Sequence, residues 1–253
     1  MKFQFVENFP AVFIPDINSL VVADFHIGFE YELLSEGIRI PNQAKKFEKE
    51  MKKLIKSTGA EKLIILGDVK HKLSKITKGE EISVLKFLNS LVEEVNVFIT
   101  LGNHDPGLEN IVPSNVYVAS SRGFRIKGFG FFHGHAWPSP RVMEARYIFM
   151  GHIHPSLLFV DEHGNSKIER IFLVTELDMS ILKKIYGKLK KIKLVVLPAY
   201  NRFLGGSILN RKKFEKKYRS PLWKEEIISE EKSEVYLLNG TYLGSLKIKK
   251  EES

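Results

Sequence analysis

The chain has no cysteine among its 253 residues, and this absence excludes several kinds of chemistry. Disulfides, iron–sulfur clusters, thiolate zinc sites and a cysteine nucleophile all require that residue. Any bound metal ion must therefore be held by histidine, carboxylate or amide groups. The sequence also lacks the run of about 20 apolar residues that a membrane span needs, and it shows no signal peptide. We therefore expect a cytoplasmic protein without a membrane partner.

Positive charge is unevenly distributed along the chain. The formal net charge is +9, from 39 basic and 30 acidic residues. Between Lys183 and Arg219, thirteen Lys or Arg residues stand against one acidic residue, Glu215. An anionic partner, most commonly nucleic acid, explains such an excess. Solubility alone explains it equally well, so the charge leaves both interpretations open.

Short apolar runs, each ended by glycine or by a polar cluster, predict five buried strands. They cover residues 19–23, 62–66, 95–101, 128–132 and 147–150. Apolar residues at helical spacing over 42–56 and 80–92 lie between the first three runs, so the chain begins β-α-β-α-β and is of the α/β class. Further strands are expected over 157–161, 167–174, 193–197 and 235–246, with a hairpin turn at 162–165 and a surface loop over 225–234.

Polar residues recur directly after these strands, at the edge where open α/β sheets bind their ligands. They are Asp24, His26, Asp68, Asn103, His104, His133, His135, His152 and His154. Six of the eight histidines are in this set, a seventh, His71, follows Asp68 by three residues, and only His163 lies elsewhere. An aspartate after a strand is often only a turn residue, and a single His-x-His is often a surface pair. Five such segments at one sheet edge together indicate a binding site.

This set of side chains suits two divalent metal ions. Aspartate and asparagine oxygens combined with neutral imidazoles match Mn, Fe or Zn better than Ca or Mg. In two-metal hydrolases the ions lie roughly 3.5–4 Å apart, polarise the phosphoryl oxygens and hold a hydroxide for in-line attack. No nucleophilic side chain is then required, which agrees with the absence of cysteine.

Five motifs in this region resemble the signature motifs of the calcineurin-like metallophosphoesterases, in that family's order. They are Asp24-x-His26, Gly67-Asp68, Gly102-Asn103-His104-Asp105, His133-Gly134-His135 and Gly151-His152-Ile153-His154. Residues 24–30, 134–138 and 196–206 are further similar to the SbcD-related or ICC-like phosphoesterases of archaea. The resemblance implies a four-layer α/β/β/α sandwich of two mixed sheets, with metal ions at one edge. We therefore expect a metallophosphoesterase core over 1–206 and a basic C-terminal extension over 207–253 that packs on or continues the core.

The resemblance also implies a role for each residue of the site. Asp24, His26 and His154 would bind one ion, Asn103, His133 and His152 the other, and Asp68 would bridge the two. Manganese is the expected metal, with iron, zinc or nickel as alternatives. His104 would face the substrate and protonate the departing oxygen, and Asp105 would orient His104 through a hydrogen bond.

Three further residues are expected near the substrate, namely His71, His135 and Arg202. His71 stands where many relatives carry an acidic residue or asparagine, and a contact with the substrate phosphate or with His104 is expected. His135 is interpreted either as a residue that contacts the substrate or one of the ligand side chains, or as a packing residue. Arg202 belongs to the segment 198–206, which is either a loop that borders the site or a simple turn.

The most specific function predicted by these observations is hydrolysis of phosphodiester bonds in DNA or RNA, a nuclease activity. The resemblance to a repair-nuclease branch and the basic stretch both support it. A phosphodiesterase or phosphatase acting on a nucleotide or another small phosphoester is the main alternative. An inactive interaction scaffold is a third, disfavoured because all seven expected ligands and His104 are present. By analogy with repair nucleases, a helicase or ATPase subunit is an expected partner, and an oligomer is left open.

Overall fold

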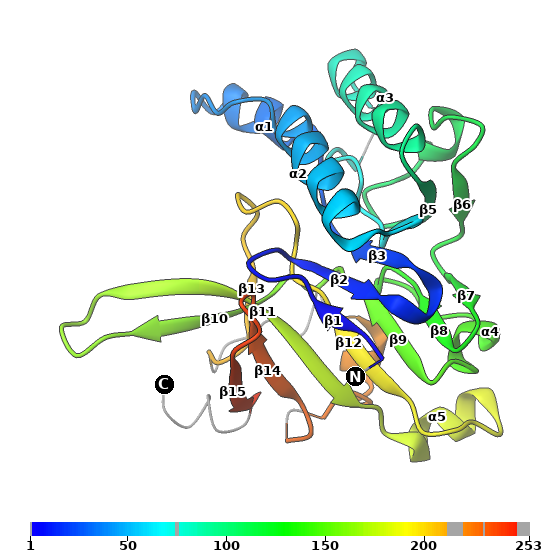
Figure 1. Cartoon of the computed structure of the whole chain (residues 1–253). Helices are drawn as coiled ribbons and strands as arrows, with labels where there is room; N and C mark the ends of the chain where they lie inside the picture. The colour runs from blue at the N-terminus through cyan, green and yellow to red at the C-terminus, as the bar shows by residue number, and fades with distance from the viewer. Residues whose placement is uncertain (1, 74–75, 212–219, 230, 247–253) are drawn as a thin grey trace.

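The computed structural model describes residues 2–73, 76–211, 220–229 and 231–246, and these form two β-sheets packed face to face (Figure 1). The six described strands of the first sheet, in spatial order, are β1 (Gln4–Phe5), β2 (Ala11–Ile14), β3 (Ser19–Val22), β4 (Lys62–Ile65), β5 (Asn96–Thr100) and β6 (Tyr117–Ala119). The first three strands are antiparallel, whereas β3 to β6 run parallel.

Helices provide the crossover connections that parallel strands require. They are α1 (Phe29–Ser35) and α2 (Gln43–Thr58) between β3 and β4, and α3 (Lys78–Val92) between β4 and β5. Two short 3₁₀ helices, η1 (Pro15–Ile17) and η2 (Leu108–Asn110), lie in the loops. The predicted β-α-β-α-β beginning of the chain is confirmed.

The second sheet is built from the later part of the chain. Its described strands run in the order β13 (Ser207–Ile208), β10 (Pro155–Val160), β11 (Ser166–Glu176), β12 (Lys193–Val196), β9 (Tyr147–Met150), β8 (Phe129–Phe131) and β7 (Phe124–Ile126), with β14 (Glu234–Leu237) on β11 and β15 (Tyr242–Ser245) on β14. It mixes parallel pairs such as β8–β9 with antiparallel pairs such as β10–β11. Because β13 pairs with β10 and β14 pairs with β11, the strands described after residue 206 belong to this same sheet.

Alternation of side chains along the strands separates the apolar core into layers. In β3, Leu20 packs with the buried residues of α2 and α3, whereas Val21 faces the second sheet. In β9, Phe149 faces the first sheet, whereas Met150 packs with residues of α4 (Pro140–Met143), α5 (Met179–Tyr186) and α6 (Pro221–Lys224). The two sheets therefore lie between two helical layers, which confirms the predicted four-layer α/β/β/α sandwich of two mixed sheets.

Both long helices of the first layer begin at side chains that satisfy their free amides. Asn42 Oδ1 accepts a hydrogen bond from Lys45 N (3.1 Å) at the start of α2, and Gly59 ends that helix with a positive φ of 65°. Thr77 and Glu80 form a reciprocal capping box at the start of α3. The buried Glu80 also accepts hydrogen bonds from the loop after β4, so this helix end helps to fix that loop.

Two sequence predictions differ from the structure in the C-terminal part. The segment 235–246 forms two strands rather than one, because the chain reverses at Gly240, whose φ is 84°. The segment 225–234 is not a simple surface loop, since Ile227 and Ile228 are buried and Ile228 bridges to Leu177. These two isoleucines lie within an otherwise polar segment, and they form part of the core that packs on the second sheet.

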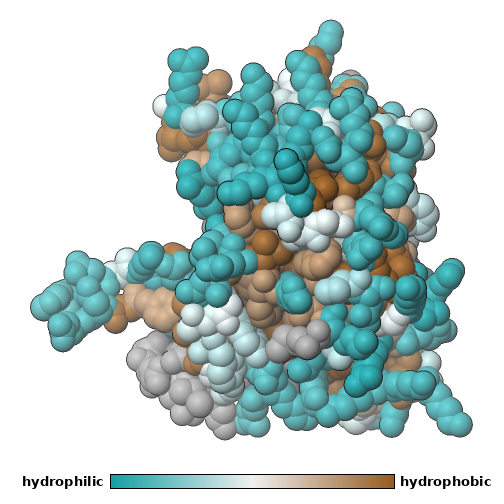
Figure 2. All heavy atoms as spheres, in the orientation of Figure 1, coloured by the Kyte–Doolittle hydropathy of each residue, from teal (hydrophilic) through white to brown (hydrophobic). Residues whose placement is uncertain are grey.

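The hairpin of β10 and β11 extends away from the two-sheet body (Figure 1). Figure 2 shows hydrophilic side chains over its tip, where the turn residues 161–165 are exposed. Two apolar side chains on the hairpin, Val160 and Ile168, are also exposed. Among the helices in the described ranges, none combines the length and the apolar character that crossing a bilayer demands.

Candidate metal centre

Polar side chains from both sheets meet at one edge of the sandwich. Each follows the end of a strand within four residues: Asp24 and His26 follow β3, Asp68 follows β4, Asn103 and His104 follow β5, His133 and His135 follow β8, and His152 and His154 follow β9. The strands β3, β4 and β5 are parallel to one another, as are β8 and β9. Their carboxyl ends therefore lie together, and the predicted clustering of these residues is observed.

One group of potential ligands consists of Asp24, His26 and His154. Each offers a ligand atom, and these atoms lie within 4.8 Å of one another. His154 Nε2 is 3.4 Å from Asp24 Oδ1, while His154 Nδ1 lies 3.4 Å from the carbonyl of Gly205. Because a carbonyl only accepts, Nδ1 carries the proton and Nε2 presents a lone pair to the site.

A second group consists of Asp68, His133 and His152, whose ligand atoms also lie within 4.8 Å of one another. His133 Nε2 lies 3.4 Å from Asp68 Oδ2 and 3.2 Å from Asn103 Oδ1. The same Oδ2 atom lies 3.3 Å from His26 Nε2, which belongs to the first group. One carboxylate oxygen of Asp68 is thus shared between the two groups, the position that a bridging ligand must have.

Imidazole nitrogens and carboxylate oxygens face one another at this centre, an arrangement that suits a bound cation. His133 Nδ1 donates to the carbonyl of Leu66 (2.6 Å), so Nε2 is the ring atom that faces the two oxygens, and it offers an ion a lone pair when the ring is uncharged. The Nε2 atoms of His26 and His154 are also buried, and neither has a hydrogen-bond partner within the described ranges. Buried polar atoms normally find partners. Nitrogen and oxygen donors in this arrangement fit a pair of transition-metal ions.

Burial and charge act in opposite directions on the imidazoles. Burial lowers the pKa of His26 to about 4, and burial together with His133 lowers the pKa of His152 to about 3. Burial also disfavours a charge on His133, but Asp68 and Asp24 outweigh it and raise the pKa of His133 to about 9. Uncharged His26 and His152 are in the state that binds metal ions.

The backbone of the centre is held in an unusual conformation. Nine non-glycine residues in the described ranges have a positive φ, and five of them belong to the two groups: Asp24, His26, Asp68, His152 and His154. Such conformations cost on the order of 1–3 kcal/mol each and persist where the surrounding structure imposes them. Their concentration here indicates that the fold directs these side chains inward.

Residues 17–207 match the family described as calcineurin-like phosphoesterase. The chain belongs to the calcineurin-like phosphoesterases. Members of this family bind divalent metal ions at a binuclear site, and the two ligand groups agree with that arrangement. The finer likeness to SbcD-related archaeal proteins stays a prediction.

One solved nuclease structure shares the fold of this chain. The nuclease MPE of Pseudomonas putida aligns over 95% of this chain and 100% of its own, with 20% sequence identity and a TM-score of 0.57. The phosphoesterase YfcE of E. coli aligns over 56% of this chain and 73% of its own, with 17% identity and a TM-score of 0.37. A sequence search against curated proteins finds no significant match.

His104, the expected proton donor of this family, lies beside the first ligand group. Its ring packs edge-on against that of His26, with centroids 4.5 Å apart. Its backbone amide donates to Asp68 Oδ1 (2.8 Å), and its Nδ1 donates to the carbonyl of His71. With Nδ1 engaged in this way, Nε2 is the ring atom left to face a substrate.

The prediction that Asp105 orients His104 through a hydrogen bond is wrong. The buried carboxylate of Asp105 instead accepts from the amides of Gly102 (2.9 Å), Val69 (2.9 Å) and Lys70 (3.3 Å). It thereby joins the loop after β5 to the loop after β4. Burial and the nearby charge of Asp68 raise the pKa of Asp105 to about 7, against the amide donors that favour its charged form.

Of the three expected substrate contacts, His71 and His135 lie inside the cluster. The His71 ring stacks on that of His104 at 5.7 Å and its carbonyl binds the same residue, so the predicted contact with His104 is observed. The His135 ring lies 5.2 Å from His133 and 5.9 Å from His152. Its buried Nδ1 has no hydrogen-bond partner in the described part of the chain.

The segment 198–206 borders the centre, as one of the two sequence interpretations expected. Tyr200 N donates to Ala23 O (2.8 Å), and the buried Asn201 donates through Nδ2 to Phe25 O (3.1 Å). Arg202 follows on the exposed side, with its guanidinium 5.3 Å from the ring centroid of Phe203. The segment is therefore attached to the strand end that carries Asp24.

Two glycines of the family motifs are required by close packing against ligand carboxylates. A Cβ atom on Gly102 would lie 2.1 Å from Asp68 Oδ1, and one on Gly151 would lie 2.5 Å from Asp24 Oδ2. No heavy atom of a neighbouring residue approaches that closely in ordinary packing. Any side chain at either position must displace a ligand.

We expect Gly102→Ala to lower the free energy of unfolding by about 1–3 kcal/mol, because the new methyl group overpacks the loop against Asp68. Urea unfolding monitored by fluorescence measures the change. Gly128→Ala is the matched control, since nothing lies within 4 Å of a Cβ built there. Equal stability of the two variants would contradict the close approach.

The described lysines of the basic stretch lie away from the metal centre, whereas Arg202 of the same stretch belongs to the loop that borders it. Residues 183–193 belong to α5 and to the start of β12, where Lys193 is the register partner of Tyr147. Tyr147 begins β9, whereas His152 follows the other end of that strand. These lysines therefore lie near the opposite edge of the second sheet. Residues 212–219 of the predicted stretch lie outside the described residues.

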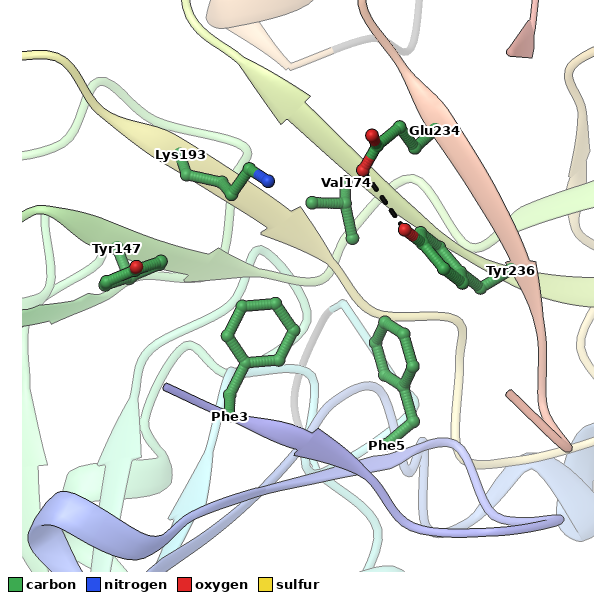
Figure 3. Close-up of a pocket in the computed structure, with 7 residues that line it drawn as sticks. All are labelled: Phe3, Phe5, Tyr147, Val174, Lys193, Glu234 and Tyr236. Atoms are coloured by element: carbon green, nitrogen blue, oxygen red, sulfur yellow. Dashed lines mark hydrogen bonds between the residues drawn. The ribbon is translucent and has the colours of Figure 1, made fainter. Parts of the chain in front are cut away.

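An aromatic cavity of about 60 Å³ also lies at that opposite edge (Figure 3). Its lining residues are Phe3, Phe5, Tyr147, Val174, Lys193, Glu234 and Tyr236. The rings already pack on one another, and the Tyr236 hydroxyl donates to Glu234 (3.1 Å). The space suits a few water molecules, so this cavity is a gap between the sheets and no part of the metal centre.

Proposed function

We propose that this chain is a two-metal-dependent phosphodiester hydrolase acting on DNA or RNA. The observation that carries the proposal is the sharing of Asp68 Oδ2 between two groups of ligand atoms. In this proposal Asp24, His26 and His154 would hold one ion, Asn103, His133 and His152 would hold the other, and Asp68 would serve both. When bound, the two ions supply the positive charge that stabilises a phosphoryl group during in-line displacement.

His104 acts on the leaving group in this proposal. Its Nδ1 proton stays with the carbonyl of His71 in either charge state of the ring, because a carbonyl only accepts. A proton on Nε2 is then the one that moves to the departing oxygen. The amide contact with Asp68 keeps the ring next to the ligand groups while this happens.

Nucleic acid is the proposed substrate class for two reasons. The chain carries a net charge of +9, and its fold resembles that of nuclease MPE along 95% of its length. The exposed Arg202, on the loop attached to the Asp24 segment, is a proposed contact to a phosphate beside the centre. His135, with its unpartnered buried Nδ1, is a second proposed substrate contact.

Hydrolysis of a nucleotide or another small phosphoester is the second candidate, and one observation favours it. The described lysines of the basic stretch lie near the edge opposite the metal centre, so they add little positive charge beside the reacting bond. A small substrate needs only the centre itself. Manganese as the metal and a helicase or ATPase partner stay predictions.

Cleavage of labelled single- and double-stranded DNA and RNA in the presence of Mn²⁺ tests the proposal. Oligonucleotides are expected to be cleaved and to inhibit hydrolysis of a small aryl phosphodiester competitively. Their inhibition should weaken steeply as salt increases, because phosphate contacts release counterions. Arg202→Ala should lower the slope of log Kd against log salt concentration by about 1.

Lys190→Ala is the charge-matched control for that variant, since the exposed Lys190 lies near the opposite edge. It should leave the salt slope unchanged. If the aryl ester is hydrolysed while oligonucleotides neither compete nor react, the function is that of a small-molecule phosphodiesterase.

A further inference from the structure

A chain of three side chains leads from helix α1 to the metal centre. Glu32, on α1, lies with Oε2 2.8 Å from His71 Nε2. On the other side of the same ring, His71 Nδ1 lies 3.3 Å from His26 Nδ1. His26 belongs to the first ligand group, so Glu32 is connected to a metal ligand through one intervening imidazole.

The carboxylate at the outer end determines where each proton of this chain lies. A carboxylate only accepts, so His71 Nε2 must carry a proton and donate it to Glu32. The Nδ1 of the neutral His71 ring is then an acceptor, and His26 Nδ1 must donate to it. His26 Nε2 is left with a lone pair, and this atom faces Asp68 Oδ2 at 3.3 Å.

The surroundings of His71 hold its ring in place for this role. Its backbone amide donates to Glu80 Oε1 (2.9 Å), and its ring packs edge-on against Phe29 at 5.0 Å. Its carbonyl binds His104 Nδ1. His71 therefore touches both a metal ligand and the proposed proton donor, while its side chain is only 12% exposed.

We propose that Glu32 is a positioning residue of the metal centre, which acts through His71 to hold His26 in the tautomer that presents Nε2 to the first ion. This inference rests on the proposed function. Partners of this kind fix the tautomer and the orientation of ligand imidazoles. A plain surface ion pair, the alternative for a carboxylate whose side chain is 49% exposed, would leave the metal centre unaffected.

Glu32→Ala, Glu32→Gln and the control Glu36→Ala separate the two interpretations. Glu36 is the C-cap residue of the same helix, and its side chain has no hydrogen bond or ion pair with another described residue. Calorimetric titration of the metal-free protein with Mn²⁺ is expected to show about 10-fold weaker binding at one site for Glu32→Ala. Glu32→Gln should restore binding, because the amide oxygen also accepts from His71 Nε2.

Ring ¹⁵N chemical shifts of His26 in the metal-free protein provide the second readout. We expect a proton on Nδ1 in the unchanged protein and in Glu32→Gln, and a mixture of tautomers in Glu32→Ala. Thermal unfolding checks that all variants remain folded, as expected for a half-exposed side chain. Hydrolysis of a small aryl phosphodiester reports on the proposed function separately.

The Mn²⁺ affinities and the His26 tautomers together test the role of Glu32. If Glu32→Ala matches Glu36→Ala in both Mn²⁺ affinity and His26 tautomer, the inference is overturned. It is also overturned if Glu32→Gln binds Mn²⁺ as weakly as Glu32→Ala does. The negative charge of Glu32, and not the hydrogen bond that it accepts from His71, would then affect the site. If the unchanged protein neither binds Mn²⁺ nor hydrolyses the ester, the proposed function is wrong, and the inference that rests on it is wrong as well.

Discussion

Asp68→Asn is expected to lower kcat/KM for every phosphodiester by about three orders of magnitude or more, because bound ions supply several kcal/mol of transition-state stabilisation and this variant loses their shared ligand. The substitution preserves shape, and the amide oxygen can still accept the hydrogen bond from His104 N. The loss is therefore specific to the carboxylate charge between His26 and His133. Initial rates, with metal content determined by mass spectrometry, measure the effect.

Asp161→Asn is the matched control for this variant. Asp161 lies at the turn between β10 and β11, where its carboxylate binds Asn165 and the amide of His163, far along the hairpin from the centre. The same chemical change there should leave both activity and metal content unaltered. An Asp68→Asn protein that retains two ions per chain and near-normal rates would show that this residue does not bridge them.

His104→Ala is expected to lower kcat by about 10²–10⁴-fold for substrates with poor leaving groups, since general-acid catalysis contributes in that range. The ligand groups built on Asp24 and Asp68 do not include His104, so the metal content should be unchanged. A nitrophenyl ester, whose leaving group departs without a proton, should lose far less rate than an alkyl or nucleotide ester. Rates for a series of esters of increasing leaving-group pKa measure this dependence.

The exposed His163 in the hairpin turn provides the control for that experiment. His163→Ala should behave as the unchanged protein with every ester. If His104→Ala loses the same factor with all leaving groups, His104 contributes charge or binding and does not deliver a proton. A loss of bound metal in His104→Ala would instead identify His104 as a ligand.

The central strands and the ligand positions were predictable from the sequence because each depends on local pattern. The runs that became β3, β4 and β9 are buried on both faces, so they read as continuous apolar segments. The shortest strands were not predicted. β13 has two residues and β6 has three, and each is defined by a partner strand that is distant in the chain, which no local pattern encodes.

The sequence did not reveal contacts that run through the backbone or through another side chain of the site. Asp105 follows His104 directly, yet its side chain turns back to the amides of Val69 and Lys70, a direction that adjacency in sequence does not reveal. Glu32 carried no signal, because its partner His71 lies 39 residues away.

Each ligand group draws on both sheets of the sandwich. Asp24, His26 and Asp68 come from the first sheet, whereas His133, His152 and His154 come from the second. An ion held by either group would therefore cross-link the two layers, in addition to the apolar packing and the hydrogen bonds that join them. In a chain without cysteine, metal coordination would take the place that a disulfide has elsewhere, and chelation would loosen the contact between the sheets before the strand pairing within either one.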